Sequence, residues 1–195
     1  NQKGVVVWFT GLPCSGKTTL TEKLRLSLHQ KNIMAYTIDG DQIRKGLNSD
    51  LGFLKEDRSE NIRRVGEVAK LFSGAGFVVI VALISPFRED RDKVRNNLGS
   101  DRFVEIYLDC PIEECEKRDV KGHYKLARNG KMQDFTGVLL FEIKSGPVDD
   151  IGVDANFHGV DDFCGPIDMQ FHFVGISVPM LLPMDDGLTC QFGQH

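Results

Sequence analysis

Residues 11–18 constrain the fold of this chain more than any other segment. They read GLPCSGKT and match the pattern G-x-x-x-x-G-K-[ST] in full. The apolar, β-branched run at residues 5–9 directly precedes them, and leucines recur every four residues from position 20 to position 28 after them. That second spacing is typical of one face of a helix. The pattern therefore predicts a phosphate-binding loop between a buried strand and a helix.

The residue types in this loop fit the chemistry of a nucleoside triphosphate. Glycine lets the backbone wrap closely around phosphate oxygens, and the N–H groups at a helix start point toward the anion. Lys17 is expected to neutralise the β- and γ-phosphates of ATP, and the Thr18 hydroxyl to coordinate Mg²⁺. The complete set predicted to bind the nucleotide within this segment is Gly11, Leu12, Pro13, Cys14, Ser15, Gly16, Lys17, Thr18 and Thr19.

Strand-like and helix-like segments alternate through the first two thirds of the chain. Further strands are predicted at residues 33–38, 77–83 and 103–108. Apolar positions between residues 62 and 72 predict a helix, and Pro111 is expected in the first turn of another. This alternation indicates βαβ units, and so an α/β fold with a mostly parallel sheet that helices cover on both faces. The longest apolar run, residues 77–84, is far shorter than the ~20 residues a membrane span needs, so no membrane association is expected.

Acidic residues follow the second predicted strand, at Asp39 and Asp41, whereas the most apolar strand runs into Ser85 and Pro86 with no acid. Many P-loop hydrolases have an aspartate at the end of such a strand, so this placement favours phosphoryl transfer to a small alcohol. A plain Asp-Gly turn is the alternative, and both interpretations are open from the residues alone. Several cations follow and suit a multiply anionic acceptor, although a solvated helix face is again the alternative: Arg44, Lys45, Arg58, Arg63 and Arg64.

Six stretches of residues 1–137 match one known family in the family's order: GLPCSGKTTL at 11–20, DGDQIRKGLN at 39–48, DLGFLKEDRSENIRRVGEVAKLF at 50–72, ALISPFREDRDKVR at 82–95, CEKRDVKG at 115–122 and DFTG at 134–137. With these motifs, about 70% of the chain resembles the adenylylsulfate kinases, which phosphorylate the ribose 3′-hydroxyl of adenylyl sulfate. The resemblance implies a P-loop kinase-like α/β fold with three layers.

The resemblance implies roles for individual residues. Lys17, Asp41 and Ser85 are the implied catalytic residues, Thr18 and Asp41 the implied Mg²⁺ ligands, and Arg118 the implied cover of the ATP base. Ser85 aligns with a serine described in the family as a phosphorylated intermediate, although direct in-line transfer needs only positioning and charge neutralisation. Phe53 and Phe135 suit stacking on the adenine. The implied contacts to adenylyl sulfate are Asp41, Arg44, Phe53, Arg58, Asn61, Ile84, Ser85, Lys121 and Phe135.

The composition changes abruptly near Gly137. Residues 1–137 carry 23 Lys and Arg against 19 Asp and Glu, whereas residues 138–195 carry one Lys against nine acids. The sequence therefore predicts a kinase domain at 1–137 and a divergent, acidic segment at 138–195 that is irregular or completes the domain in its own way. An out-of-frame translation of the family's end and a fused unrelated segment are alternatives. The alternating residues 171–178 are expected to supply an edge strand.

The predicted activity is ATP-dependent phosphorylation of adenylyl sulfate to 3′-phosphoadenylyl sulfate in sulfate assimilation, with ATP and Mg²⁺. The alternatives are a P-loop kinase for another small anionic alcohol, a non-catalytic nucleotide-binding regulatory relative, and a chain that its tail renders inactive. The resemblance implies a homodimer and fusion to, or association with, a sulfate adenylyltransferase. A net charge of −4 argues against nucleic-acid binding, and five irregularly spaced cysteines indicate reduced thiols in the cytoplasm.

Overall fold

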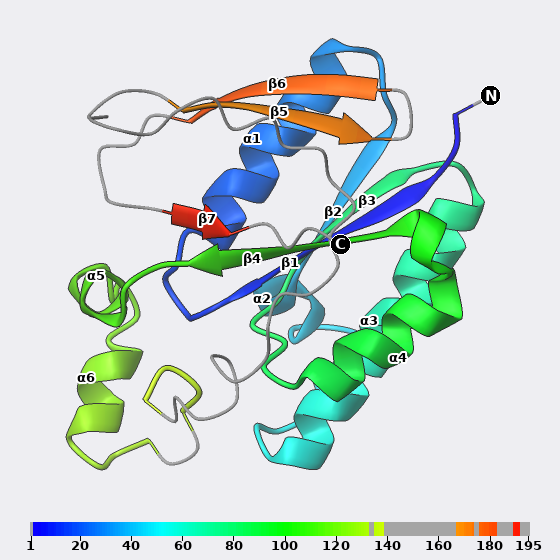
Figure 1. Cartoon of the computed structure of the whole chain (residues 1–195). Helices are drawn as coiled ribbons and strands as arrows, with labels where there is room; N and C mark the ends of the chain where they lie inside the picture. The colour runs from blue at the N-terminus through cyan, green and yellow to red at the C-terminus, as the bar shows by residue number, and fades with distance from the viewer. Residues whose placement is uncertain (1, 133–134, 139–166, 174–175, 183–188, 192–195) are drawn as a thin grey trace.

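The computed structural model describes residues 2–132, 135–138, 167–173, 176–182 and 189–191, with side chains described within 2–138 (Figure 1). Helices and strands alternate along residues 5–128, as the sequence predicts. The elements are β1 (Val5–Gly11), α1 (Lys17–Gln30), β2 (Ala35–Asp39), α2 (Gly40–Ile43), α3 (Lys55–Gly74), β3 (Val78–Ala82), α4 (Arg88–Leu98), the 3₁₀ turn η1 (Ser100–Arg102), β4 (Phe103–Asp109), α5 (Ile112–Lys117), α6 (His123–Arg128), β5 (Ile167–Phe173), β6 (Ile176–Leu182) and β7 (Thr189–Gln191).

The described strands form a five-stranded sheet in the order β2-β3-β1-β4-β7 and a separate two-stranded sheet, β5-β6. The pairs β2–β3, β3–β1 and β1–β4 are parallel, with Val7 of β1 opposite Ile80 on one side and Val104 on the other. β7 adds an antiparallel edge, with Cys190 opposite Leu108. The prediction of an α/β fold with a mostly parallel sheet is confirmed, and parallel strands bring their carboxyl ends to one edge.

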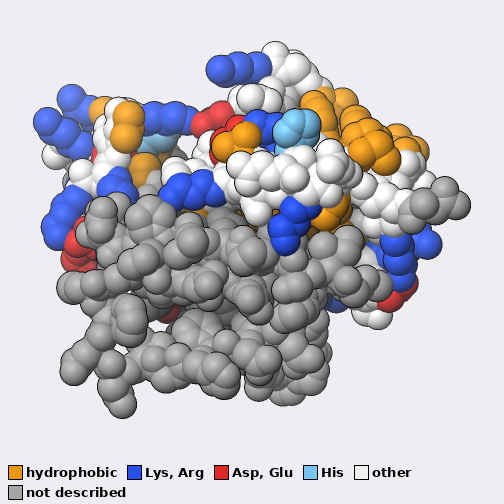
Figure 2. Space-filling model, turned by 90° about the horizontal axis from the view of Figure 1, so that it is seen from above, with side chains coloured by type: hydrophobic (Ala, Val, Ile, Leu, Met, Phe, Trp, Pro, Cys, Tyr) orange, Lys and Arg blue, Asp and Glu red, His pale blue; other side chains and the backbone are white. Residues whose placement is uncertain are grey.

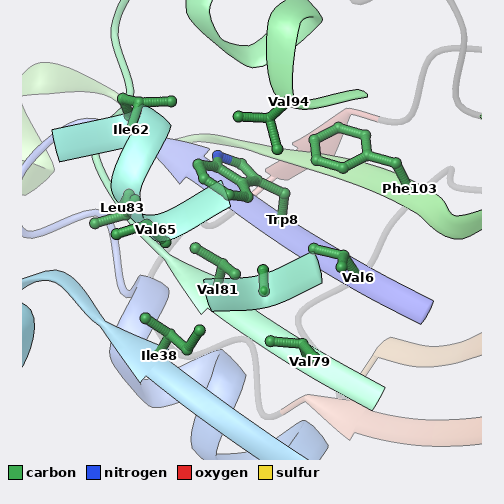
Figure 3. Packing of buried hydrophobic residues seen from close by; sticks show 11 residues of the cluster. Val6, Trp8, Ile38, Ile62, Val65, Val79, Val81, Leu83, Val94 and Phe103 are labelled. Carbon is green, nitrogen blue, oxygen red and sulfur yellow. The ribbon is translucent and has the colours of Figure 1, made fainter. Parts of the chain in front are cut away.

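Each face of the sheet is covered by helices, because successive side chains of β1 point to opposite sides. Val5, Val7 and Phe9 pack with the buried leucines of α1 on one face. Val6 and Trp8 pack on the other face with α3 and α4 (Figure 3). Trp8 is fully buried there, between Ile62 and Val65 of α3 and Val94 of α4. The sheet thus holds the loop after β1 on a rigid base.

Two sequence predictions are corrected by the structure. The single edge strand expected at residues 171–178 is wrong, because this segment spans the end of β5 and the start of β6, which pair with each other. The edge strand beyond β4 is β7 instead. Pro111 is the residue before α5 rather than part of its first turn.

The helix α4 has no counterpart in the predicted elements. Its sequence, REDRDKVRNNL, is so polar that only Asp90 and Val94 are buried. In the part of the chain that the structure describes, no helix is both long and apolar enough to cross a membrane.

One part of the surface is apolar. Figure 2 shows hydrophobic side chains gathered on one part of the face seen from above, whereas Lys and Arg side chains are spread across it. Among the exposed large apolar residues are Met34 and Tyr36 at the edge strand β2 and Leu71 on α3. The Tyr36 ring stacks on that of Phe72, with centroids 4.8 Å apart.

Candidate active site

The loop that joins β1 to α1 has the backbone geometry of an anion cradle. Gly11 has a φ of +146°, and a Cβ there would lie 2.9 Å from the Leu108 carbonyl oxygen, so a side chain would clash with β4. Gly16 precedes α1 with a φ of +93° and gives the helix no side-chain cap. The N–H groups of the first turn of α1 are therefore left for a ligand, as a phosphate site requires.

Lys17 lies inside this loop rather than in solvent. Its Nζ donates to the carbonyl oxygens of Gly11 at 3.0 Å and Leu12 at 2.5 Å and to Ser15 Oγ at 3.2 Å. The residue is only 9% exposed. Burial disfavours its charged form and lowers the pKa of Lys17 to about 8. An ammonium that is this poorly hydrated gains strongly from an incoming phosphate.

Two acids stand at the carboxyl end of β2 and have different partners. Asp39 Oδ2 accepts a hydrogen bond from Thr18 Oγ1 at 3.0 Å, and Asp39 Oδ1 accepts from the backbone N–H of Asp41. The Asp41 carboxylate instead forms an ion pair with Lys121, from the turn between α5 and α6. The second bond of Asp39 also caps α2, which explains why a helix starts directly after the strand.

The pair Thr18 and Asp39 fits a magnesium ion. Both supply hard oxygen donors, and Mg²⁺ is commonly held by one or two protein oxygens together with substrate phosphates and water. Residues 2–132 and 135–138 contain no cluster of three or more His, Cys, Asp or Glu side chains that could hold a metal by itself. The structure thus brings Asp39 to the predicted ligand Thr18, whereas sequence reasoning assigned Asp41 as the second ligand.

An exposed aromatic ring beyond α2 has two guanidinium groups close to it. Phe53 is 61% exposed, and the Arg44 Cζ lies 4.5 Å and the Arg58 Cζ 5.6 Å from the centre of its ring. Arg58 Nε donates to the Phe53 carbonyl oxygen at 2.8 Å, and Arg44 Nη1 to that of Gly52 at 2.9 Å. These bonds hold an open aromatic surface beside two positive charges, as an anionic nucleotide would need.

A clamp that the sequence analysis did not assign fixes the segment before Phe53. Arg64 of α3 donates to both carboxylate oxygens of Asp50, at 2.7 and 2.8 Å, and to the Leu47 carbonyl oxygen at 3.1 Å. Its Nε also donates to Glu60. Asn61, one turn earlier on the same helix, is buried and accepts from Asn48 Nδ2 at 2.9 Å. In the sequence Arg64 is one of several cations, and no pattern there points to Asp50 or Leu47 as its partners.

Ser85 lies at the centre of a chain of hydrogen bonds that ties β1 to the segment after β3. Trp8 Nε1 donates to Ser85 Oγ at 3.0 Å, which donates to Thr10 Oγ1 at 2.9 Å. Thr10 Oγ1 in turn donates to the Ile84 carbonyl oxygen at 2.7 Å. Ser85 is buried and has a φ of +36°. Its hydroxyl is therefore held inside the protein, in a backbone conformation that side chains rarely adopt.

The remaining predicted residues surround the loop from the α5–α6 side. Phe135 is buried edge-on against Tyr124 of α6, with ring centroids 5.0 Å apart. Tyr124 Oη donates to the Pro13 carbonyl oxygen at 3.0 Å, which attaches α6 to the phosphate loop. Arg118, at the end of α5, donates to Cys110 Sγ. Phe53 and Phe135, both predicted to stack on adenine, thus stand in different surroundings, one open and one buried.

Leu12 and Cys14 of the loop pack against the protein core, whereas Thr19 does not. Leu12 is buried with Cys110 and Cys115, and Cys14 packs against them. Burial is also the largest cause of the raised pKa of the Cys14 thiol. Thr19 is exposed on α1. This microenvironment does not favour a thiolate at Cys14.

Comparison with known proteins assigns the family. Residues 3–142 match the family model described as "Adenylylsulphate kinase". The chain belongs to the adenylylsulphate kinase family. It is 60% identical over 137 residues to the adenylyl-sulfate kinase of Clostridium acetobutylicum, covering 70% of this chain and 68% of the relative. It is 55% identical over 147 residues to that of Clostridium kluyveri, covering 75% and 73%.

Solved structures of the family agree with the fold. The structure of the Mycobacterium tuberculosis APS kinase CysC in complex with AMPPNP and APS superposes with a TM-score of 0.66 at 43% identity, covering 69% of this chain and 79% of that chain. A hexameric APS kinase from Thiobacillus denitrificans superposes with a TM-score of 0.51 at 30% identity, covering 68% of this chain and 30% of that chain. The match to the family model ends at residue 142, five residues past the boundary predicted at Gly137.

Proposed function

We propose that this chain is an adenylyl-sulfate kinase that transfers the γ-phosphoryl group of ATP to the 3′-hydroxyl of adenylyl sulfate. The observation that carries the proposal is the family match, joined to an intact phosphate loop that holds a buried, poorly hydrated Lys17. The acids at the end of β2 and the two guanidinium groups around Phe53 supply the features that this reaction needs beyond ATP binding.

On the donor side, the loop residues bind and orient the triphosphate. Phosphate oxygens would replace the carbonyl oxygens of Gly11 and Leu12 as partners of the Lys17 ammonium, so charge neutralises charge in a site that excludes water. Thr18 and Asp39 would hold Mg²⁺, which supplies neutralisation of the charge that develops on the β- and γ-phosphates. Arg118 is proposed to lie over the ATP base.

On the acceptor side, we assign Phe53 to the adenine and Arg44 and Arg58 to the anionic phosphosulfate. Asn61, Ile84, Lys121 and Phe135 complete the proposed contacts. Asp41 is proposed to accept the proton of the 3′-hydroxyl, and its ion pair with Lys121 places a cation next to that carboxylate. An acceptor oxygen held near Asp41 and in line with the γ-phosphate needs little further assistance, since positioning and electrostatics provide most of phosphoryl-transfer catalysis.

Ser85 is proposed to position the substrate rather than to carry the phosphoryl group. Its hydroxyl already accepts from Trp8 and donates to Thr10 within a buried chain of hydrogen bonds. A phosphoserine there would lose the bond donated to Thr10, because the ester oxygen carries no hydrogen, and would bury at least one negative charge, which is costly. Direct transfer from ATP to the acceptor avoids that cost. It predicts that Ser85→Ala retains measurable turnover.

The test of this function is a panel of acceptors offered to the full chain with Mg-ATP. ADP release is measured with adenylyl sulfate, AMP, adenosine and gluconate at equal concentrations. The proposal predicts release with adenylyl sulfate well above the others, because only it offers both the adenine and the phosphosulfate to Phe53, Arg44 and Arg58. A preference for another acceptor would favour a different small-molecule kinase, and nucleotide binding without release from any acceptor would favour a regulatory relative.

Self-association and location belong to the same proposal. We propose a homo-oligomer, supported by the hexameric relative among the solved structures, with a dimer as the expected unit. Light scattering of the full chain tests it. Association with a sulfate adenylyltransferase stays a prediction of the sequence. A cytoplasmic location is proposed from the free thiols of Cys14, Cys110 and Cys115 and from the usual site of this activity.

A further inference from the structure

The buried pair Asn48 and Asn61 joins the segment before Phe53 to the helix α3. Asn48 has no exposed surface and Asn61 is 5% exposed. Asn48 Nδ2 donates to Asn61 Oδ1 at 2.9 Å. The backbone on both sides of Asn48 is fixed too, since its N–H donates to Ile43 and its carbonyl oxygen accepts from Leu51. An asparagine with this burial and this attachment has one rotamer available to it.

The hydrogen bond between the two amides determines the polarity that Asn61 offers to a ligand. A carboxamide has one acceptor end and one donor end. Because Asn48 occupies the acceptor end of Asn61, the NH₂ group is the end left for the substrate. With both amides turned over, the Asn48 NH₂ group would lose the bond to Asn61 and stay buried, whereas in the observed arrangement this group donates to Asn61 and Asn48 Oδ1 is the atom without a partner among the described residues.

We infer that Asn48 is a positioning residue that holds Asn61 with its NH₂ group toward the acceptor nucleotide, so that Asn61 selects a hydrogen-bond acceptor atom of adenylyl sulfate. This inference rests on the proposed function and adds to it the polarity of one contact. Asn48 itself touches no substrate. Asn48 prevents rotation of the Asn61 carboxamide. That rotation would place Asn61 Oδ1 against a hydrogen-bond acceptor of the substrate, and two acceptors repel each other.

The location of Asn48 supports a role in this site rather than in global stability. It sits between α2 and Phe53, in the segment that Arg64 holds through Leu47 and Asp50. The same segment leads to the ring flanked by Arg44 and Arg58. Burying a polar group costs stability unless the group is hydrogen-bonded. The buried Asn48 amide bonds to Asn61 and thereby orients it at the proposed acceptor site.

The test is a double-mutant cycle on the full chain with Asn48→Ala, Asn61→Ala and the double variant. We measure kcat and the KM values for adenylyl sulfate and for ATP. Loss of one oriented hydrogen bond predicts that Asn48→Ala raises the KM for adenylyl sulfate about fivefold to tenfold, with the KM for ATP unchanged. In the Asn61→Ala background, Asn48→Ala should produce no further rise, because its only route to the substrate is gone. Asn96→Ala, on the exposed face of α4, is the control.

Several outcomes would overturn the inference, and they differ from failure of the proposed function. An unchanged KM for adenylyl sulfate in Asn48→Ala, equal rises for both substrates, or full additivity with Asn61→Ala would each contradict a positioning role. If Asn48→Ala does not fold, as judged by thermal unfolding and ATP binding, Asn48→Leu replaces it in the same cycle and carries the same expectations, because leucine is close to asparagine in size and has no hydrogen-bond donor. Absence of turnover in the unmodified chain would instead contradict the proposed function itself.

Discussion

Replacing Glu105 with glutamine should destabilise the chain more than any other single change of charge in the described sheet. Glu105 lies on β4 with a side chain only 8% exposed. It accepts from Arg91 Nε at 2.6 Å and from Arg95 Nη2 at 2.6 Å. Glu105→Gln keeps the shape and one acceptor oxygen but removes the charge and one of these two bonds. The two guanidinium groups, 16% and 21% exposed, then lose their buried counter-charge.

The expected loss follows from these contacts. A hydrogen bond to a charged group contributes about 1.5–3 kcal/mol, and breaking a buried pair by removing one partner costs about 3–5 kcal/mol. Since glutamine keeps one bond, we expect a loss of about 3 kcal/mol in the free energy of unfolding. Urea unfolding followed by the fluorescence of Trp8, which lies opposite Glu105 on the adjacent strand β1, measures it.

The matched control is Asp101→Asn, which removes an exposed ion pair with Lys3 at 3.1 Å. We expect no measurable shift of the urea midpoint there, because solvent screens such pairs. Turnover of Glu105→Gln is a second readout, because Arg91 also donates to the Ser85 carbonyl oxygen in the site, at 2.8 Å. A loss below about 1 kcal/mol for Glu105→Gln, or one equal to that of the control, would refute the view that burial gives this pair its strength.

Four further predictions concern residues of the site. Because burial lowers the pKa of Lys17 to about 8, ATP affinity should fall between pH 8 and 10 and binding near pH 9 should take up a proton; calorimetry in two buffers would contradict this if no proton moved. The lowered pKa of Lys17 also costs stability in the folded, ligand-free chain at neutral pH, because the buried side chain is charged there. As the pH rises from about 8 to 10.5, the folded chain loses this proton before the unfolded chain does, so the free energy of unfolding should increase; Lys17→Met should lack this increase. Asp39→Asn should raise the Mg²⁺ concentration for half-maximal turnover about tenfold, whereas an unchanged requirement would remove Asp39 from the metal site. Arg64→Lys should raise the KM for adenylyl sulfate several-fold and leave that for ATP, since lysine cannot bridge Asp50 and Leu47; equal rises would contradict the clamp.

The sequence predicts those helices and strands whose buried faces show a local apolar periodicity. The run at residues 5–9 becomes β1 and the leucines after the loop face the sheet from α1, because apolar periodicity and burial coincide there. The helix α4 escapes prediction because the contacts that stabilise it follow no apolar periodicity. They are those of Val94 with the core, of Asp90 with Ser59 and Lys93, and of Arg91 and Arg95 with Glu105. The order of the strands is likewise a property of the whole chain.

Within the site, residue types are predictable but pairings are not. An acid pair after the second strand suggests a metal, yet only the structure shows that Asp39 meets Thr18 while Asp41 meets Lys121. The buried relay from Trp8 through Ser85 to Thr10 joins residues more than 70 positions apart, so no local pattern reveals it. Most of the predicted segment at 138–195 lies outside the described residues. In its described part, β5 and β6 pair with each other and β7 pairs with β4.

Direct identification of the product tests the central claim. The full chain is incubated with Mg-ATP and adenylyl sulfate, and the nucleotides are separated by anion exchange, in parallel with Lys17→Ala. The account predicts 3′-phosphoadenylyl sulfate from the unmodified chain and none above background from the variant, which lacks the ammonium that meets the phosphates. ADP without this product, or the same yield from Lys17→Ala, would contradict it.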